Sequence, residues 1–142
     1  MKPFKQICAD TNPKNLENIR KYMEQTNCVQ YMDEFLAEAR KGSAVEFPKS
    51  FCLVTENYFC SYCWYWPRSI HVIPLTEITN LYRTCIDAFG GYDFQNFRLN
   101  VECKDGREVL TSTIPRRAKT VDTLFDDVIT YVKKRIAELE VM

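Results

Sequence analysis

Two alternating segments on either side of residues 105 and 106 constrain this chain more than any other feature. Apolar and polar residues alternate between positions 96 and 104, which is typical of a strand with one buried face. Asp105-Gly106 is the dipeptide favoured by two-residue type I′ hairpin turns. In that register Lys104 faces Arg107, and the expected pairs beyond it are Val101 with Leu110, Leu99 with Ser112 and Phe97 with Ile114. Pro115 is expected to end the second strand, because proline has no backbone donor for a ladder.

A long C-terminal helix is expected to follow a basic loop at residues 116–119. Thr120 is its expected N-cap, and the apolar residues after it recur at helical spacing. They are Val121, Leu124, Phe125, Val128, Ile129, Val132, Ile136 and Leu139. Aspartates come early and basic residues late in this segment, as the helix dipole favours.

The rest of the chain predicts a helical hairpin followed by further strands. Asn12-Pro13 is an N-cap followed by proline at the first helical position, and Asn27 is the expected cap of a second helix. Residues 1–11 are expected to be a loosely held tail. Strands are expected at residues 51–54, 58–66, 70–73 and 78–87, with a turn at Thr55-Glu56-Asn57 between the first two.

Composition excludes several classes of protein. The chain has 142 residues, and its 19 lysines and arginines balance its 19 aspartates and glutamates, so its formal charge is zero. This balance argues against nucleic-acid binding, which needs a basic surplus. No apolar run reaches the length of a transmembrane segment, and the first residues lack the apolar stretch of a signal peptide. We therefore expect a cytoplasmic protein.

Several short motifs occur in an order that resembles bacterial pleckstrin-homology-like domains of the GRAM type. The resemblance covers roughly residues 51–139 and rests on four motifs. They are Leu53-Val54-Thr55-Glu56-Asn57-Tyr58, Ile73-Pro74-Leu75-Thr76-Glu77-Ile78, Lys104-Asp105-Gly106-Arg107 and the helix from Val121. The resemblance implies a bent, partly open barrel closed by the helix, which serves as a binding platform without enzyme activity. Phosphoinositide binding is not carried over, because the first hairpin turn has an acid and no base.

The expected fold class is therefore α+β. It comprises two N-terminal helices, six or seven antiparallel strands in a bent sheet or partly open barrel of the pleckstrin-homology-like type, and the long C-terminal helix. We expect a single domain over residues 1–142, with the helical hairpin at residues 12–42 and the sheet and closing helix at residues 50–141.

The seven cysteines are a high count, and two of them form a C-x-x-C motif, Cys60 and Cys63. That spacing serves zinc or thiol–disulfide exchange in turns, but residues three apart in a strand lie on opposite faces. We therefore expect neither metal nor redox function, and no cofactor. If residues 55–57 form a three-residue loop, Cys52 faces Cys60 directly, and in a reducing cytosol we expect both as free thiols.

No motif predicts catalysis. His71 is the only histidine, and Cys63 or Cys85 is a conceivable nucleophile beside it. An orienting acid and an oxyanion site are also needed, and no motif supplies them. We therefore expect no enzyme activity and no catalytic residue.

Two groups of residues are candidates for binding. The aromatic strand carries Tyr58, Tyr62, Trp64 and Trp66; it is either an exposed interface or a strand buried on both faces under the N-terminal helices. The basic residues around the second hairpin are candidates for an anion: Arg98, Lys104, Arg107, Arg116, Arg117 and Lys119. The alternative for the second group is a solvated surface neutralised by Asp122, Asp126 and Asp127.

The expected function is a non-catalytic cytoplasmic interaction or scaffolding module. A protein partner or a second copy is expected to bind through the aromatic strand or a free sheet edge. One alternative is peripheral recognition of an anionic lipid or small ligand by the basic hairpin end. The other is a thiol or zinc protein that uses the C-x-x-C motif.

Overall fold

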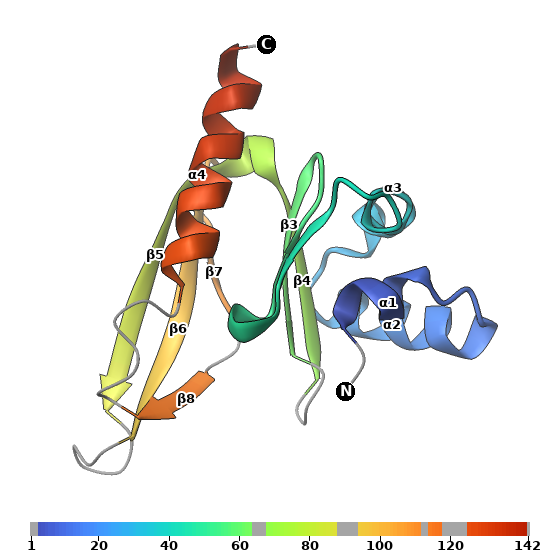
Figure 1. Cartoon of the computed structure of the whole chain (residues 1–142), viewed down its shortest axis with the longest axis horizontal. Helices are drawn as coiled ribbons and strands as arrows, with labels where there is room; N and C mark the ends of the chain where they lie inside the picture. The colour runs from blue at the N-terminus through green and yellow to red at the C-terminus, as the bar shows by residue number, and fades with distance from the viewer. Residues whose placement is uncertain (1–2, 64–67, 88–93, 112–113, 118–124, 142) are drawn as a thin grey trace. The chain divides into compact units, whose positions relative to one another are not determined.

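The computed structural model describes residues 3–63, 68–87, 94–111, 114–117 and 125–141, and these residues form an α+β structure (Figure 1). Contacts group the chain into two compact units, Met1–Leu75 and Thr76–Met142. Each unit holds an antiparallel sheet and at least one helix. The expected α+β class and C-terminal helix are confirmed, whereas the pleckstrin-homology-like architecture and the single domain over residues 1–142 stay predictions.

The first unit begins with helices on one side of its sheet (Figure 1). Its helical elements are α1 (Phe4–Ala9), α2 (Pro13–Gln25), the 3-10 turn η1 (Val29–Tyr31) and α3 (Met32–Ala39). The expected start of α2 is confirmed, because the Asn12 side chain accepts a hydrogen bond from the Lys14 N–H at 2.9 Å and Pro13 is the first helical residue. The expected cap of the second helix at Asn27 is wrong. Asn27 has a φ of +57° just beyond α2, and α3 begins only at Met32.

Helix α1 was not expected, because residues 1–11 were interpreted as a tail. The carboxylate of Glu46, in strand β1 (Val45–Phe47), accepts hydrogen bonds from the backbone N–H groups of Phe4 at 3.3 Å and Lys5 at 2.7 Å. The Phe4 ring stacks on Tyr62 with a centroid separation of 4.1 Å. These partners are about 40 or more positions away in sequence, so no local pattern predicts the helix.

The sheet of the first unit has the order β1-β2-β3-β4. After β1 come the 3-10 turn η2 (Pro48–Ser50), β2 (Cys52–Val54), β3 (Tyr58–Cys63) and β4 (Ser69–Pro74). One face of the sheet packs with the helices into a core. Its buried residues are Leu53, Tyr58, Cys60, Tyr62, Ile70 and Val72, which pack with Phe4, Ile19, Met23, Phe35 and Leu36 among others.

The β2–β3 register differs by one residue from the expected one. Cys52 faces Ser61, and Leu53 faces Cys60, so Cys52 and Cys60 lie on opposite faces. The reason is that the loop has two residues rather than three. The Thr55 N–H donates to the Tyr58 carbonyl at 2.9 Å, so Thr55 and Tyr58 belong to the ladder.

The second unit contains a sheet and helix α4. The 3-10 turn η3 (Leu75–Glu77) precedes β5 (Ile78–Asp87), which has the bounds expected from the sequence. It pairs with β6 (Phe94–Cys103), which pairs in turn with β7 (Glu108–Leu110) and β8 (Ile114–Arg117). Helix α4 (Asp126–Val141) contacts β5 and buries Val128 and Val132. Its expected N-cap, Thr120, lies outside the described residues.

The Asp105-Gly106 turn also differs by one residue from the expected hairpin. Val101 faces Val109 and not Leu110. The Arg107 carbonyl accepts from the Cys103 N–H at 2.9 Å, which closes a three-residue loop. Gly106, at φ +83°, takes the left-handed position that such a loop requires.

Farther along, the register returns to the expected one, and Phe97 faces Ile114. Pro115 does not end the second strand, because β8 continues to Arg117. Within the described residues β8 pairs only with β6, and an edge strand tolerates a missing donor on its outer side. None of the described helices is both long and apolar enough to span a membrane.

Candidate functional site

The aromatic strand does not form a surface at its two described tyrosines. Tyr58 and Tyr62 are only 6% and 4% exposed. Tyr58 packs against Tyr31 and Phe35, and Tyr62 stacks on Phe4. Of the two alternatives for this strand, burial under the N-terminal helices therefore holds for these residues. Trp64 and Trp66 lie outside the described residues.

The register of β6 does not bring the six candidate basic residues together. Lys104 and Arg107 lie in the turn at one end of this strand, whereas Arg116 and Arg117 pair with Gln95 and Phe94 at the other end. Ten strand residues at about 3.3 Å each separate the two ends by roughly 30 Å. Arg98 lies between them, and Lys119 is outside the described residues. A single anion site built from all six does not fit this register.

Arg107 is also engaged locally. Its guanidinium lies 3.9 Å from the carboxylates of both Glu77 and Asp105. Its backbone N–H donates to the Asp105 carboxylate at 2.9 Å. These contacts help to hold the turn, and they leave the hairpin end without a clear excess of positive charge.

Most of the described cysteines are buried. Cys60 and Cys63 lie on opposite faces of β3, as expected from their spacing. Burial raises the pKa of the Cys8 thiol to about 12 and the pKa of Cys60 well above its ordinary value. Thiols that keep their proton are poor nucleophiles and poor metal ligands. Among the described residues, no group of three or more histidine, cysteine or acidic side chains is placed to hold a metal ion.

His71 faces Ser61 across β3 and β4, and burial lowers the pKa of its imidazole. Ser61 in turn faces Cys52 across β2 and β3, so three side chains capable of catalysis form one row. The pKa of Cys52 is raised by burial, and no acid in the described register orients His71. This row therefore has no activated nucleophile.

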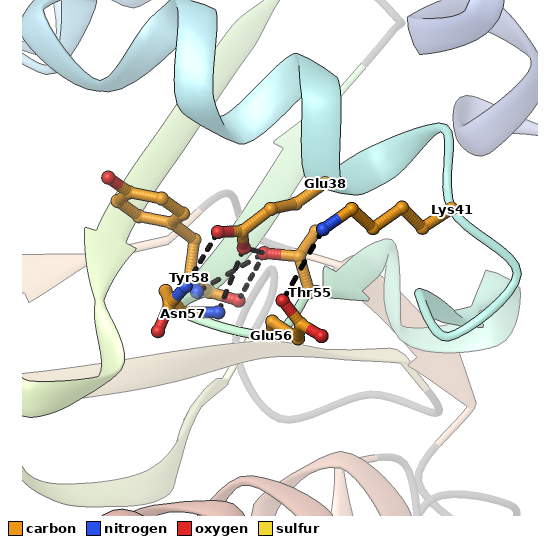
Figure 2. A network of polar contacts seen from close by, with 6 residues as sticks. All are labelled: Glu38, Lys41, Thr55, Glu56, Asn57 and Tyr58. Atoms are coloured by element: carbon orange, nitrogen blue, oxygen red, sulfur yellow. Dashed lines mark hydrogen bonds and ion pairs between the residues drawn. The ribbon is translucent and has the colours of Figure 1, made fainter.

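The sequence did not predict the polar network around Glu38 in the first unit (Figure 2). Glu38 lies near the end of α3, and its carboxylate is buried. It accepts hydrogen bonds from the Thr55 hydroxyl at 2.8 Å and from the N–H and side-chain amide of Asn57 at 2.9 and 2.7 Å. Three donors from within the unit thus bind this carboxylate. The network anchors the β2–β3 turn to α3.

A second polar cluster lies on the sheet of the other unit. The Asn100 side chain accepts from the Thr84 hydroxyl at 2.9 Å and donates to the Glu108 carboxylate at 2.9 Å. Its amide also lies 3.4 Å from the Tyr82 hydroxyl. These contacts connect β5, β6 and β7 on one face of the sheet. The polar atoms of the Asn100 side chain therefore have their hydrogen-bond partners within the sheet.

The sheet edges of the two units differ in how they are protected. At the β4 edge, the Ile70 carbonyl accepts hydrogen bonds from the Thr26 hydroxyl at 2.5 Å and the Cys28 thiol at 3.6 Å. The β1 edge has only three residues. Short strands and covering side chains are the usual protection of an edge against pairing with another chain.

The β5 edge is ten residues long, and no strand among the described residues pairs with β5 on the side away from β6. Both backbone groups of Leu99 bond to Thr111, on the β7 and β8 side of β6: its carbonyl accepts from the Thr111 N–H at 3.1 Å, and its N–H donates to the Thr111 hydroxyl at 3.0 Å. Antiparallel pairs alternate in their bonding, so Arg83, which faces Leu99, directs its backbone groups away from β6. The backbone groups of Leu81 and Cys85, two positions on either side of Arg83, also point away from β6.

No family model, curated protein or solved structure matches this chain. The functional assignment therefore depends on the geometry of its own residues.

Proposed function

We propose that this chain is a non-catalytic interaction module that binds an extended segment of a protein partner by strand addition to β5. The outward backbone of β5 carries the proposal, because this ten-residue edge has no paired strand among the described residues, and such an edge is a template for another strand. The mean strand in globular proteins has only about five or six residues. The module acts in the cytoplasm, in keeping with the buried thiols of Cys8, Cys52 and Cys60, which form no disulfide.

The composition of β5 favours this proposal. Its sequence contains neither proline nor lysine, the residues that most often protect an exposed edge. Its one irregularity lies near its start, between Ile78 and Asn80, and leaves the remaining pairs regular. The other route expected for a partner, through the aromatic strand, is weakened by the burial of Tyr58 and Tyr62.

The alternatives have less in their favour. Recognition of an anionic lipid or small ligand needs convergent basic residues, and these lie at both ends of β6. A thiol or zinc protein needs cysteines that share a face, and Cys60 and Cys63 do not. Membership of the pleckstrin-homology-like group is part of our proposal and is compatible with strand addition, because that fold serves as a binding platform.

The test compares two substitutions at one outward position. Arg83→Ala removes the side chain and keeps the outward N–H, whereas Arg83→Pro also removes the N–H. Peptides selected from a random display library against the unmodified protein serve as the probe. We expect their affinity to fall at least tenfold more with Arg83→Pro than with Arg83→Ala.

Backbone amide shifts give the second measurement. A selected peptide that adds as a strand shifts the amide resonances of Leu81, Arg83 and Cys85 more than those of Tyr82 and Thr84. Equal binding to both variants, or shifts confined to another part of the chain, contradicts strand addition at β5. Both variants are first checked for an unchanged circular dichroism spectrum.

A further inference from the structure

The apolar pattern of β2 does not determine its register against β3. Cys52, Leu53 and Val54 are all buried, with at most 1% of each exposed. A slip by one residue moves a strand's side chains to the opposite faces, which is costly only when one face is polar. In β2 the slip exchanges one buried apolar set for another. Something outside the strand must therefore select the register.

The Glu38 carboxylate lies where it can make that selection (Figure 2). It accepts from the backbone and side chain of Asn57 and from the hydroxyl of Thr55. The Thr55 hydroxyl is in turn 3.2 Å from the Tyr58 N–H, at the first ladder position. These bonds fix Glu56 and Asn57 as the two loop residues. In a three-residue loop Thr55 leaves the ladder, and its hydroxyl and the Asn57 N–H no longer hold these positions together.

We propose that Glu38 is a register lock for the β2–β3 hairpin, and that this lock keeps Cys52 and Cys60 on opposite faces of the sheet. In the register with a three-residue loop, the two cysteines face each other. The two Cα atoms of a hydrogen-bonded antiparallel pair are about 5.5 Å apart, and this separation lies within the range of Cα separations found in disulfides. The lock thus protects two buried thiols of the core from bridging.

The register can be determined directly from nuclear Overhauser effects between Hα atoms. The Tyr62 N–H donates to the Phe51 carbonyl, so Cys52–Ser61 and Val54–Phe59 are the non-bonded pairs, in which facing Hα atoms are closest. We expect these two cross-peaks in the unmodified protein. In Glu38→Gln we expect loss of at least part of their intensity and new cross-peaks for Phe51–Ser61 and Leu53–Phe59.

Disulfide formation gives an independent measurement. Oxidised glutathione added to the slipped hairpin accepts two electrons and two protons from Cys52 and Cys60, which form one disulfide, and leaves as two molecules of reduced glutathione. We expect a peptide linked through Cys52 and Cys60, two protons lighter than its reduced parts, from Glu38→Gln and not from the unmodified protein. Cys60→Ser in the Glu38→Gln background abolishes it.

Glu56→Gln is the matched control, because Glu56 is the neighbouring loop acid and pairs with Lys41 at 3.6 Å outside the lock. It is expected to keep the native cross-peaks alone. A folded Glu38→Gln protein with only the native cross-peaks overturns the proposal, and so does a Cys52–Cys60 bridge in the unmodified protein. If Glu38→Gln does not fold, Thr55→Val, which keeps both Asn57 bonds, is measured in the same way. Native cross-peaks alone in that variant limit Glu38 to a role in stability and overturn the lock.

Discussion

At the residue scale, Glu38 shows how a buried charge can be structural. Its carboxylate is removed from water, and three donors from the β2–β3 turn replace the lost hydration. Burial without these partners is costly, so the helix and the turn depend on each other. A carboxylate at an open site would suggest acid–base chemistry, but the donors that Glu38 binds belong to the β2–β3 hairpin.

Replacing Glu38 by glutamine is expected to lower the free energy of unfolding by about 1–3 kcal/mol, because one acceptor becomes a donor that faces the Asn57 amide. Urea unfolding followed by circular dichroism measures the change. Glu56→Gln removes the charge of the exposed pair with Lys41 and is expected to cost about 0–1 kcal/mol. Equal costs for the two variants are incompatible with a specific role for Glu38.

Several residue-level predictions from the sequence were right because their causes are local. Asn12 and Pro13 start α2, and Cys60 and Cys63 lie on opposite faces, as strand geometry requires. Glu38 was not predicted, because its partner Thr55 is 17 positions away and a single acid in a helix gives no signal of what it accepts from. The aromatic strand was left between two alternatives, because only the position of the N-terminal helices decides its burial.

At the element scale, the strand bounds were easier to predict than the registers. Alternation and flanking turns gave β5 its bounds, but both hairpins are shifted by one residue from the expected pairing. In the second hairpin Asp105-Gly106 suits both a two-residue and a three-residue loop. Asp105 accepts from the Arg107 N–H, and Gly106 alone takes a positive φ, which selects the three-residue form.

Gly106→Ala is therefore expected to destabilise the protein by about 1 kcal/mol, because only the left-handed backbone, and no steric contact, opposes the new methyl group. Gly42→Ala is the matched control, since its added methyl also has no neighbour within 4 Å and its φ is not positive. It is expected to leave stability unchanged or slightly raised. Thermal unfolding of both variants measures the difference, and a neutral Gly106→Ala contradicts the assigned turn.

Helix α1 is an element that depends on its partners. Phe4 is buried and stacks on Tyr62. If α1 unfolds together with the rest of the unit, Phe4→Ala is expected to lower the free energy of unfolding by about 3–5 kcal/mol. A smaller cost with faster amide exchange confined to residues 4–9 indicates instead that α1 detaches locally. Hydrogen exchange separates these outcomes, with Lys5→Ala, a change at the same helix outside the ring stack, as the control. Normal protection of α1 in Phe4→Ala contradicts this anchor.

At the scale of the whole molecule, buried ionisable groups are concentrated in the helix and sheet core of the first unit. Burial raises the pKa of Cys8 to about 12 and of Tyr58 to about 12, against ordinary values of 9.0 and 10.0. It also raises the pKa of Cys60 and Tyr62, and for Tyr62 the neighbouring Glu46 carboxylate adds to the effect. All four belong to the same core cluster or contact it. Because of these raised pKa values, the stability of this core depends on pH in the alkaline range.

The folded protein keeps these protons at pH values where the unfolded chain releases them, so the free energy of unfolding falls as pH rises. The stabilisation is complete below pH 9, the ordinary thiol value, and is lost progressively from there towards pH 12, where Cys8 ionises in the folded state. Each group contributes at most about 1.4 kcal/mol per pH unit.

Urea unfolding in reductant between pH 7 and 11 measures this effect. The free energy of unfolding is expected to be constant up to about pH 8 and to fall with increasing slope above pH 9. Tyr62→Phe removes one such group, so its fall above pH 10 is expected to be shallower. A stability that stays flat from pH 8 to 11 contradicts the burial of these groups in one core.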